Sequence, residues 1–380
     1  MSNLLRIRPS STAEMLETFS DRVTIGHALA FEVALAQAEA AEGVIAHDAA
    51  TAICEACSAI AIDPAELAEE AALAGTLAIP LVERLRAAIP AHAATALHKG
   101  ATSQDIADTV LMMQAVAAAK HLAADLSRIC AALYDAAERY AGTAAVGRTL
   151  LQDALPIGFG LRLAQTAAGI DDAAGRLSAE VSANARIQFG GAAGTRAGLD
   201  GKGAAIAARM AGALGLDPKV PWHARRIGVA AIATALGLVI GALGKLARDI
   251  SLLAQNAVGE AREPAIRGRG GSSAMAHKRN PTGCQVALSA AIRAPGLVAG
   301  ILSGLPQEEE RGLGGWQAEG PALAELFLLA AGAAQAMMIV AEGLDIDEAA
   351  VARNLKAAGL GTDIGESAAI VAALLAERRG

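Results

Sequence analysis

The sequence predicts an all-α protein whose centre is a bundle of long helices. Hydrophobic residue types make up 54% of the 380 residues, but aromatic residues make up only 2%. Ala therefore supplies much of the apolar content; it is the best helix former, whereas β-sheets favour aromatic and β-branched residues. Apolar side chains also recur at helical spacing, as at Ile106, Val110 and Met113. These observations together exclude an all-β domain.

The expected helices differ in length along the chain. Up to about residue 100 they are short, with breaks at Gly43, Pro64, Pro80 and Pro90. Longer helices are expected over about 109–140, 157–185, 227–257 and 321–343, and short ones return from Asp345. We therefore expect three domains: an N-terminal helical domain over 1–105, a central long-helix bundle over 106–344, and a short C-terminal helical domain over 345–380.

Charge and composition exclude several classes of function. The formal charge is −7, which argues against a general nucleic-acid binder because such proteins carry a basic face. The start of the chain is polar and lacks the apolar stretch of a signal peptide, so a cytoplasmic location is expected. The uncharged run over 227–244 is long enough to cross a membrane. Its Ala and Gly content instead favours a buried helix in a bundle, with no membrane partner.

Four polar, glycine-containing segments interrupt the helices, over 98–108, 147–156, 188–196 and 262–281. In a helical body such segments are where function should be sought. The last segment, over 262–281, contains five cationic residues and only one acidic residue, Glu263. This excess of positive charge predicts an anionic ligand, and a solvated surface loop is the alternative. The five are Arg262, Arg267, Arg269, Lys278 and Arg279.

The segment over 98–108 leads directly into an expected helix. Thr102 and Asp105 have the spacing of a capping box, so helix capping alone can account for Thr102. A helix N-terminus with hydroxyl groups at Thr102 and Ser103 is also a ready site for a carboxylate. His98 lies just before it, and we consider this histidine a candidate proton relay or carboxylate ligand.

The string over 271–281 resembles the signature GSSxMxxKxNP of the fumarase/aspartase superfamily. Seven positions match: Gly271, Ser272, Ser273, Met275, Lys278, Asn280 and Pro281. The resemblance implies a three-domain helical fold whose central bundle tetramerises, and an elimination reaction β to a carboxylate. It also implies that Ser272 is the general base, with Ser273 as the other candidate of the pair. Lys278 and Asn280 would bind the substrate and its aci-carboxylate intermediate.

Other strings are similar to one branch of this superfamily, the 3-carboxy-cis,cis-muconate cycloisomerases. The run from His98 to Asp105 is close to their HxGATSQD form, although Lys99 stands where they usually have Trp. In the segment over 147–156, Thr149 and Gln152 would contact the substrate. The strings over 188–195, 221–226 and 310–319 are also similar, and Arg226 falls on a family arginine expected to bind substrate.

Leu150 distinguishes the chain from two other branches. Argininosuccinate and adenylosuccinate lyases place a histidine acid at this point, and leucine cannot donate a proton. The resemblance therefore implies lactonisation in the protocatechuate branch of the β-ketoadipate pathway, without cofactor or metal. The implied partners are a small anionic tricarboxylate or dicarboxylate and further copies of the chain, in a homotetramer with shared active sites. Two alternatives stay open: another lyase of the superfamily acting on a dicarboxylate, and a catalytically silent structural relative.

Overall fold

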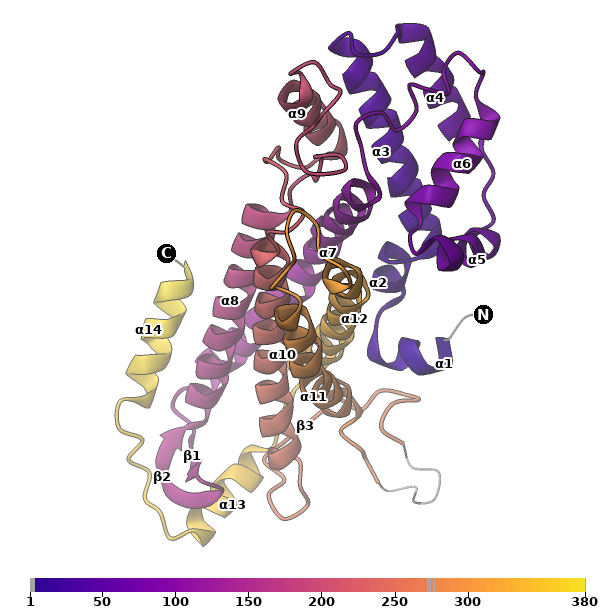
Figure 1. Cartoon of the computed structure of the whole chain (residues 1–380). Helices are drawn as coiled ribbons and strands as arrows, with labels where there is room; N and C mark the ends of the chain where they lie inside the picture. Colours follow the sequence, from indigo (N-terminus) through magenta and orange to yellow (C-terminus); the bar gives the residue numbers. More distant parts are fainter. Residues whose placement is uncertain (1–3, 272–274, 276–277, 380) are drawn as a thin grey trace.

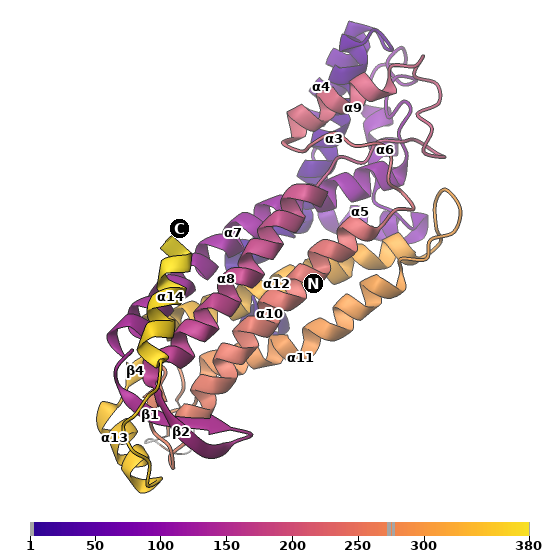
Figure 2. The same ribbon diagram turned by 90° about the vertical axis from the view of Figure 1, so that its left-hand side faces the viewer.

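Five long helices run side by side as the body of the molecule (Figure 1, Figure 2). The computed structural model describes residues 4–271, 275 and 278–379. The five helices are α7 (Ser103–Arg139), α8 (Phe159–Asn184), α10 (Ile227–Leu253), α11 (Thr282–Ser303) and α12 (Gly315–Glu342). Small residues allow them to approach closely: a Cβ added at Gly244 of α10 would lie 2.7 Å from the Cβ of Ala291 on α11. The predicted all-α fold with a central bundle is confirmed.

Short helices gather at one end of the bundle, together with the longer α3 (Figure 1). They are α3 (Asp21–Ala41), α4 (His47–Ala59), α5 (Pro64–Ala74), α6 (Ala78–Ala88) and α9 (Gly203–Leu214). The first elements of the chain lie along the side of the bundle, where Ser10 packs against Gly332 in the middle of α12. They are α1 (Leu4–Ile7), η1 (Arg8–Ser10) and α2 (Ala13–Thr18). The boundaries of α5 show why the chain breaks here. The Asp63 carboxylate accepts the Ala65 N–H at 2.7 Å before Pro64, and Gly75 ends the helix at φ 72°.

The opposite end of the bundle carries two strand pairs and the last helices. Strands β1 (Ala144–Thr149) and β2 (Gln152–Gly158) form an antiparallel hairpin, and β3 (Ala261–Arg262) pairs with β4 (Asp345–Ile346). They are followed by α13 (Glu348–Ala357) and α14 (Ser367–Arg379). The hairpin was not predicted. Its turn residues, Leu150 and Leu151, have φ values of 52° and 65° and are 96% and 75% exposed.

Helix α11 was also absent from the predicted long helices, because Pro295 and Gly296 interrupt its sequence. By length and composition alone α10, α11 and α12 could each cross a membrane, but 56% and 72% of the most apolar stretches of α10 and α12 are buried within the bundle. Only 22% of that stretch of α11 is buried, so its apolar surface is largely uncovered in one chain. The domain boundaries at 105 and 344 stay predictions.

Candidate active site

The N-terminus of α7 lies beside a cavity. The Thr102 N–H donates to the Asp105 carboxylate at 3.0 Å, so the predicted capping box is present. Ser103, the first residue of α7, lines a cavity of about 530 Å³ together with Trp316 and Gln317 at the start of α12. A helix N-terminus carries partial positive charge, and hydroxyl donors beside it can bind a carboxylate.

Asp105 holds two segments that are distant in the sequence against the N-terminus of α7. Its buried carboxylate accepts the N–H groups of Gly190 and Gly191 at 3.0 and 2.9 Å. His223 Nε2 lies 2.7 Å from the same carboxylate. The packing leaves no room for a side chain at Gly190, where an added Cβ would lie 2.6 Å from His223 Cε1. Segments over 188–196 and 221–226 are therefore fixed against the start of α7.

Arg226 lies between two buried carboxylates from different helices. Its guanidinium donates two hydrogen bonds of 2.8 Å to Asp108 on α7 and one of 2.6 Å to Glu319 on α12. Burial alone would lower the pKa of Arg226, but the two carboxylates outweigh this and raise it. The side chain is 1% exposed and stacks on the Trp222 ring at 4.7 Å. From the sequence we expected Arg226 to bind substrate. In the structure its N–H groups instead donate to carboxylates of α7 and α12, and the residue directly precedes α10, so it joins these three helices.

Two further side chains surround the same helix end. Arg311, an exposed residue of the segment between α11 and α12, donates to the Thr102 hydroxyl. His98 lies just before α7 with its Nδ1 2.6 Å from an oxygen of the buried Glu32 on α3. Burial lowers the pKa of His98, but the Glu32 hydrogen bond and charge outweigh this, so the pKa is raised. A guanidinium and an imidazole therefore accompany the hydroxyls at this end of the bundle.

Thr149 and Gln152 lie at the opposite end, beside the exposed tip of the β1–β2 hairpin. The hairpin is held close to its turn, because Arg148 donates two hydrogen bonds, of 3.1 and 2.6 Å, to the buried Glu260. Glu260 directly precedes β3, so this ion pair joins the hairpin to the start of the segment over 262–281. The tip itself extends away from the bundle (Figure 2).

The segment over 262–281 begins and ends at the N-terminus of α11. The Glu263 carboxylate accepts the N–H groups of Gly283 and Cys284 at 3.0 and 2.7 Å. Near its end, Asn280 Nδ2 donates to the Gly271 carbonyl at 3.2 Å, and Lys278 is exposed. Ser272 and Ser273 lie outside the described residues.

One chain does not bring the predicted site residues together. Thr102 and Ser103 begin α7, whereas Thr149 and Gln152 follow its far end. A helix of 37 residues is about 55 Å long at 1.5 Å per residue, and α7 has that number. Lys278 also lies at the far end, in the segment that leads into α11 at Thr282.

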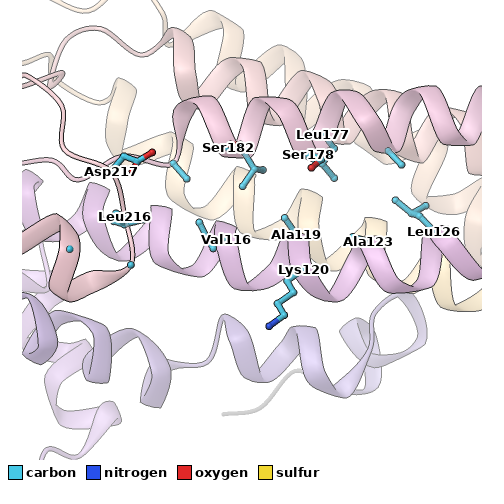
Figure 3. A pocket seen from close by; sticks show the side chains of 15 residues that line it. Val116, Ala119, Lys120, Ala123, Leu126, Leu177, Ser178, Ser182, Leu216 and Asp217 are labelled. Carbon is cyan, nitrogen blue, oxygen red and sulfur yellow. The ribbon is translucent and has the colours of Figure 1, made fainter. Parts of the chain in front are cut away.

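A separate apolar groove runs between α7 and α8, beside the end of α9 (Figure 3). It is lined by Val116, Leu126, Leu177 and Leu216 among others, with Lys120 and Asp217 at its margins. None of the predicted site residues lines it. It therefore contributes nothing to the candidate site.

Comparisons with known proteins decide the family. The family model described as lyase matches residues 9–296. The chain belongs to the fumarase/aspartase superfamily. A 3-carboxy-cis,cis-muconate cycloisomerase from Bradyrhizobium diazoefficiens is 47% identical over 91% of this chain and 78% of that protein. A cycloisomerase of the same name from Pseudomonas aeruginosa is 46% identical over 90% of this chain and 76% of the relative. The crystal structure of a 3-carboxy-cis,cis-muconate lactonizing enzyme from Pseudomonas putida is 40% identical, with a TM-score of 0.87, and covers 93% of this chain and 80% of that one.

Two residues at this superfamily site escaped sequence reasoning. Arg311 follows three glutamates, a pattern that is typical of a solvated surface segment. Its contact with the Thr102 hydroxyl becomes visible only in the fold. Glu32 did leave a signal: it is an acidic residue in an otherwise apolar helical stretch, next to Phe31 and Val33. A buried carboxylate requires a partner, but the sequence does not reveal that the partner is His98.

Proposed function

We propose that the chain is a 3-carboxy-cis,cis-muconate cycloisomerase, an intramolecular lyase of the protocatechuate branch of the β-ketoadipate pathway. One observation carries the proposal: relatives with this name are 46–47% identical over about nine-tenths of the chain. The position of Leu150 at the hairpin tip supports it, because an isomerase whose leaving group is a carboxylate needs no histidine acid there. The enzyme acts in the cytoplasm on a small anionic tricarboxylate.

The reaction closes a lactone within one molecule. One substrate carboxylate adds to a double bond, an aci-carboxylate forms, and a proton is then delivered to the carbon beside it. Ser272 supplies that proton and removes it in the reverse direction. The nucleophile belongs to the substrate, so the enzyme has only to orient it and exclude competing geometries.

The substrate carboxylates are held by groups from both ends of the bundle. Thr102 and Ser103 donate hydroxyl hydrogen bonds at the α7 N-terminus, where the helix dipole adds to the attraction. From the other end, Lys278 and Asn280 stabilise the charge that develops in the aci-carboxylate, and Thr149 and Gln152 complete the site. Arg226 acts behind these groups by fixing α7, α10 and α12 relative to one another.

The site is shared between copies of the chain in a homotetramer. Groups separated by the length of α7 cannot meet in one chain, but they meet when copies pack with their bundles in opposite directions. The uncovered apolar surface of α11 supplies the interface such packing needs. Closed symmetry makes every site in the tetramer equivalent.

An absorbance assay with 3-carboxy-cis,cis-muconate tests the activity, because cyclisation removes the conjugated diene. Ser272→Ala should lower kcat by at least about 10²-fold, as expected for loss of a positioned proton donor. Ser273→Ala is the matched control and should retain activity. An unchanged spectrum with pure wild-type protein overturns the assignment and directs the search to other dicarboxylates or to a silent relative.

Mixed tetramers test the sharing of the site. Ser272→Ala and Thr102→Val chains, each inactive alone, should regain activity when unfolded and reassembled together, with about a quarter of the sites free of both defects. Thr102→Val mixed with Ser103→Ala is the control, because both defects lie at the same helix end and no intact site forms. Absence of recovery in the first mixture would show that the groups come from one chain.

A further inference from the structure

His98 is held in an unusual backbone conformation by a carboxylate that has no other hydrogen-bond partner within the described part of the chain. Its backbone φ is 58°, a left-handed conformation that costs energy for a residue with a side chain. Its Nδ1 lies 2.6 Å from Glu32 Oε1, and Glu32 is 1% exposed. The second oxygen of Glu32 is buried without a hydrogen-bond partner among the described residues. A short contact to a buried carboxylate is typical of a charge-assisted hydrogen bond.

The surroundings favour the protonated ring. Three charged groups face His98 from the elements packed around it: Glu32 on α3, Asp105 on α7 and Arg86 on α6. Burial and Arg86 lower the pKa of His98, but the hydrogen bond and charge of Glu32, together with Asp105, raise it on balance. Burial also raises the pKa of Glu39, two turns along α3, to about 8, so at neutral pH it is uncharged.

We propose that Glu32 is a positioning residue that holds His98 as an imidazolium, so that its Nε2 N–H donates to a substrate carboxylate at the start of α7. The proposal rests on the proposed function and narrows the role of His98. An imidazolium has two donors and no acceptor, so His98 acts as a carboxylate ligand and not as a base. Nδ1 is committed to Glu32, while Nε2 has no hydrogen-bond partner among the described residues.

The test is the pH dependence of kcat/KM for the wild type and Glu32→Gln. In the wild type, activity should fall on the alkaline side as His98 loses its proton. Without the Glu32 charge this fall should move to lower pH by at least about one unit. The loss should appear mainly in KM and should largely disappear at a pH low enough to protonate His98 without help. Glu32→Asp keeps the charge but places the carboxylate farther from His98, because its side chain is one methylene shorter. It should shift the pH profile less, and it serves as the test variant if Glu32→Gln does not fold.

Glu39→Gln is the matched control: the same substitution on the same buried face of α3, at a residue that does not contact His98. Its pH profile should follow the wild type. His98→Asn should remove the alkaline fall altogether. A Glu32→Gln variant with the wild-type profile, or with the same loss at every pH, overturns the proposal and leaves Glu32 a structural role.

A measurement without substrate separates this proposal from the proposed function. Deuterium exchange at the imidazole C2 carbon, followed by mass spectrometry, gives the pKa of the His98 ring in the free protein. Glu32→Gln should lower that pKa, and Glu39→Gln should not. If the wild type fails to turn over 3-carboxy-cis,cis-muconate but this shift is found, the substrate assignment fails while the Glu32–His98 pair stands. If the shift is absent, the pair itself is refuted.

Discussion

Replacing Glu39 by glutamine should stabilise the protein at neutral pH. Glu39 lies on α3 and is fully buried, and neither of its carboxylate oxygens has a hydrogen-bond partner among the described residues. Burial raises the pKa of Glu39 to about 8, although the positive charge of Lys99 offsets part of this rise. The folded protein therefore holds a proton on Glu39 at pH 7 that the unfolded chain releases.

The size of the effect follows from the difference in pKa. The ordinary value is 4.5 and the folded value about 8, so at pH 7 the folded state keeps this proton at a cost of about 3 kcal/mol per subunit. Because the folded state binds more protons, the stability contributed at this position falls as the pH rises from 4.5 to about 8. Glutamine has nearly the same shape and no charge in either state. The gain should therefore be about 3 kcal/mol at pH 7 and close to zero near pH 4.5.

Thermal unfolding at pH 5.0, 7.0 and 8.5, at equal subunit concentration, measures this dependence. For a chain of 380 residues, a gain of 3 kcal/mol corresponds to a rise in Tm of about 4 °C. Glu32→Gln is the matched control and should destabilise at neutral pH, because it removes the partner of a protonated histidine. A Glu39→Gln variant whose Tm exceeds the wild type by the same amount at every pH would refute the reasoning, since the gain would then not come from a proton.

Three further variants test other parts of the structure. Arg226→Met should lower stability by about 3–5 kcal/mol per subunit or prevent folding, because two carboxylates are left buried without a cation; a soluble variant with unchanged Tm contradicts the ion-pair role. Arg311→Gln should raise KM for the substrate about tenfold with little change in kcat, and an unchanged KM would remove Arg311 from the site. Replacing Leu150 by Asn and Leu151 by Gly supplies residues that favour the observed turn, yet it should weaken the proposed tetramer in light scattering. Full assembly and activity would show that the exposed leucines have no partner.

Residue spacing and composition were enough to predict four of the five long helices, all except α11. The series at Ile106, Val110 and Met113 lies on the inner face of α7, where the first two are buried. The capping box at Thr102 and Asp105 was predicted to within a residue, because it depends only on local spacing. Fold class and the start of α7 were therefore accessible from the sequence.

Features that depend on the fold were not accessible. A hairpin is normally indicated by turn residues such as Gly, Asn or Asp. The turn here consists of Leu150 and Leu151, so strands β1 and β2 were not predicted. Arg226 matched a family position, but its burial depends on carboxylates 118 and 93 residues away in the chain. The contact of Glu32 with His98 spans 66 residues. Partners at such distances are chosen by packing, which a single sequence does not display.

The uncovered apolar surface of α11 has a consequence for how the protein reaches its final state. A newly folded single chain exposes a helix whose mean hydropathy over its most apolar stretch is 1.6. That surface attracts any other apolar surface, so assembly into the proposed tetramer competes with aggregation. Assembly depends on subunit concentration, whereas folding of one chain does not, so refolding yield should pass through a maximum as the protein is diluted. Polar substitutions on α11, made to increase solubility, should leave a soluble chain that no longer assembles.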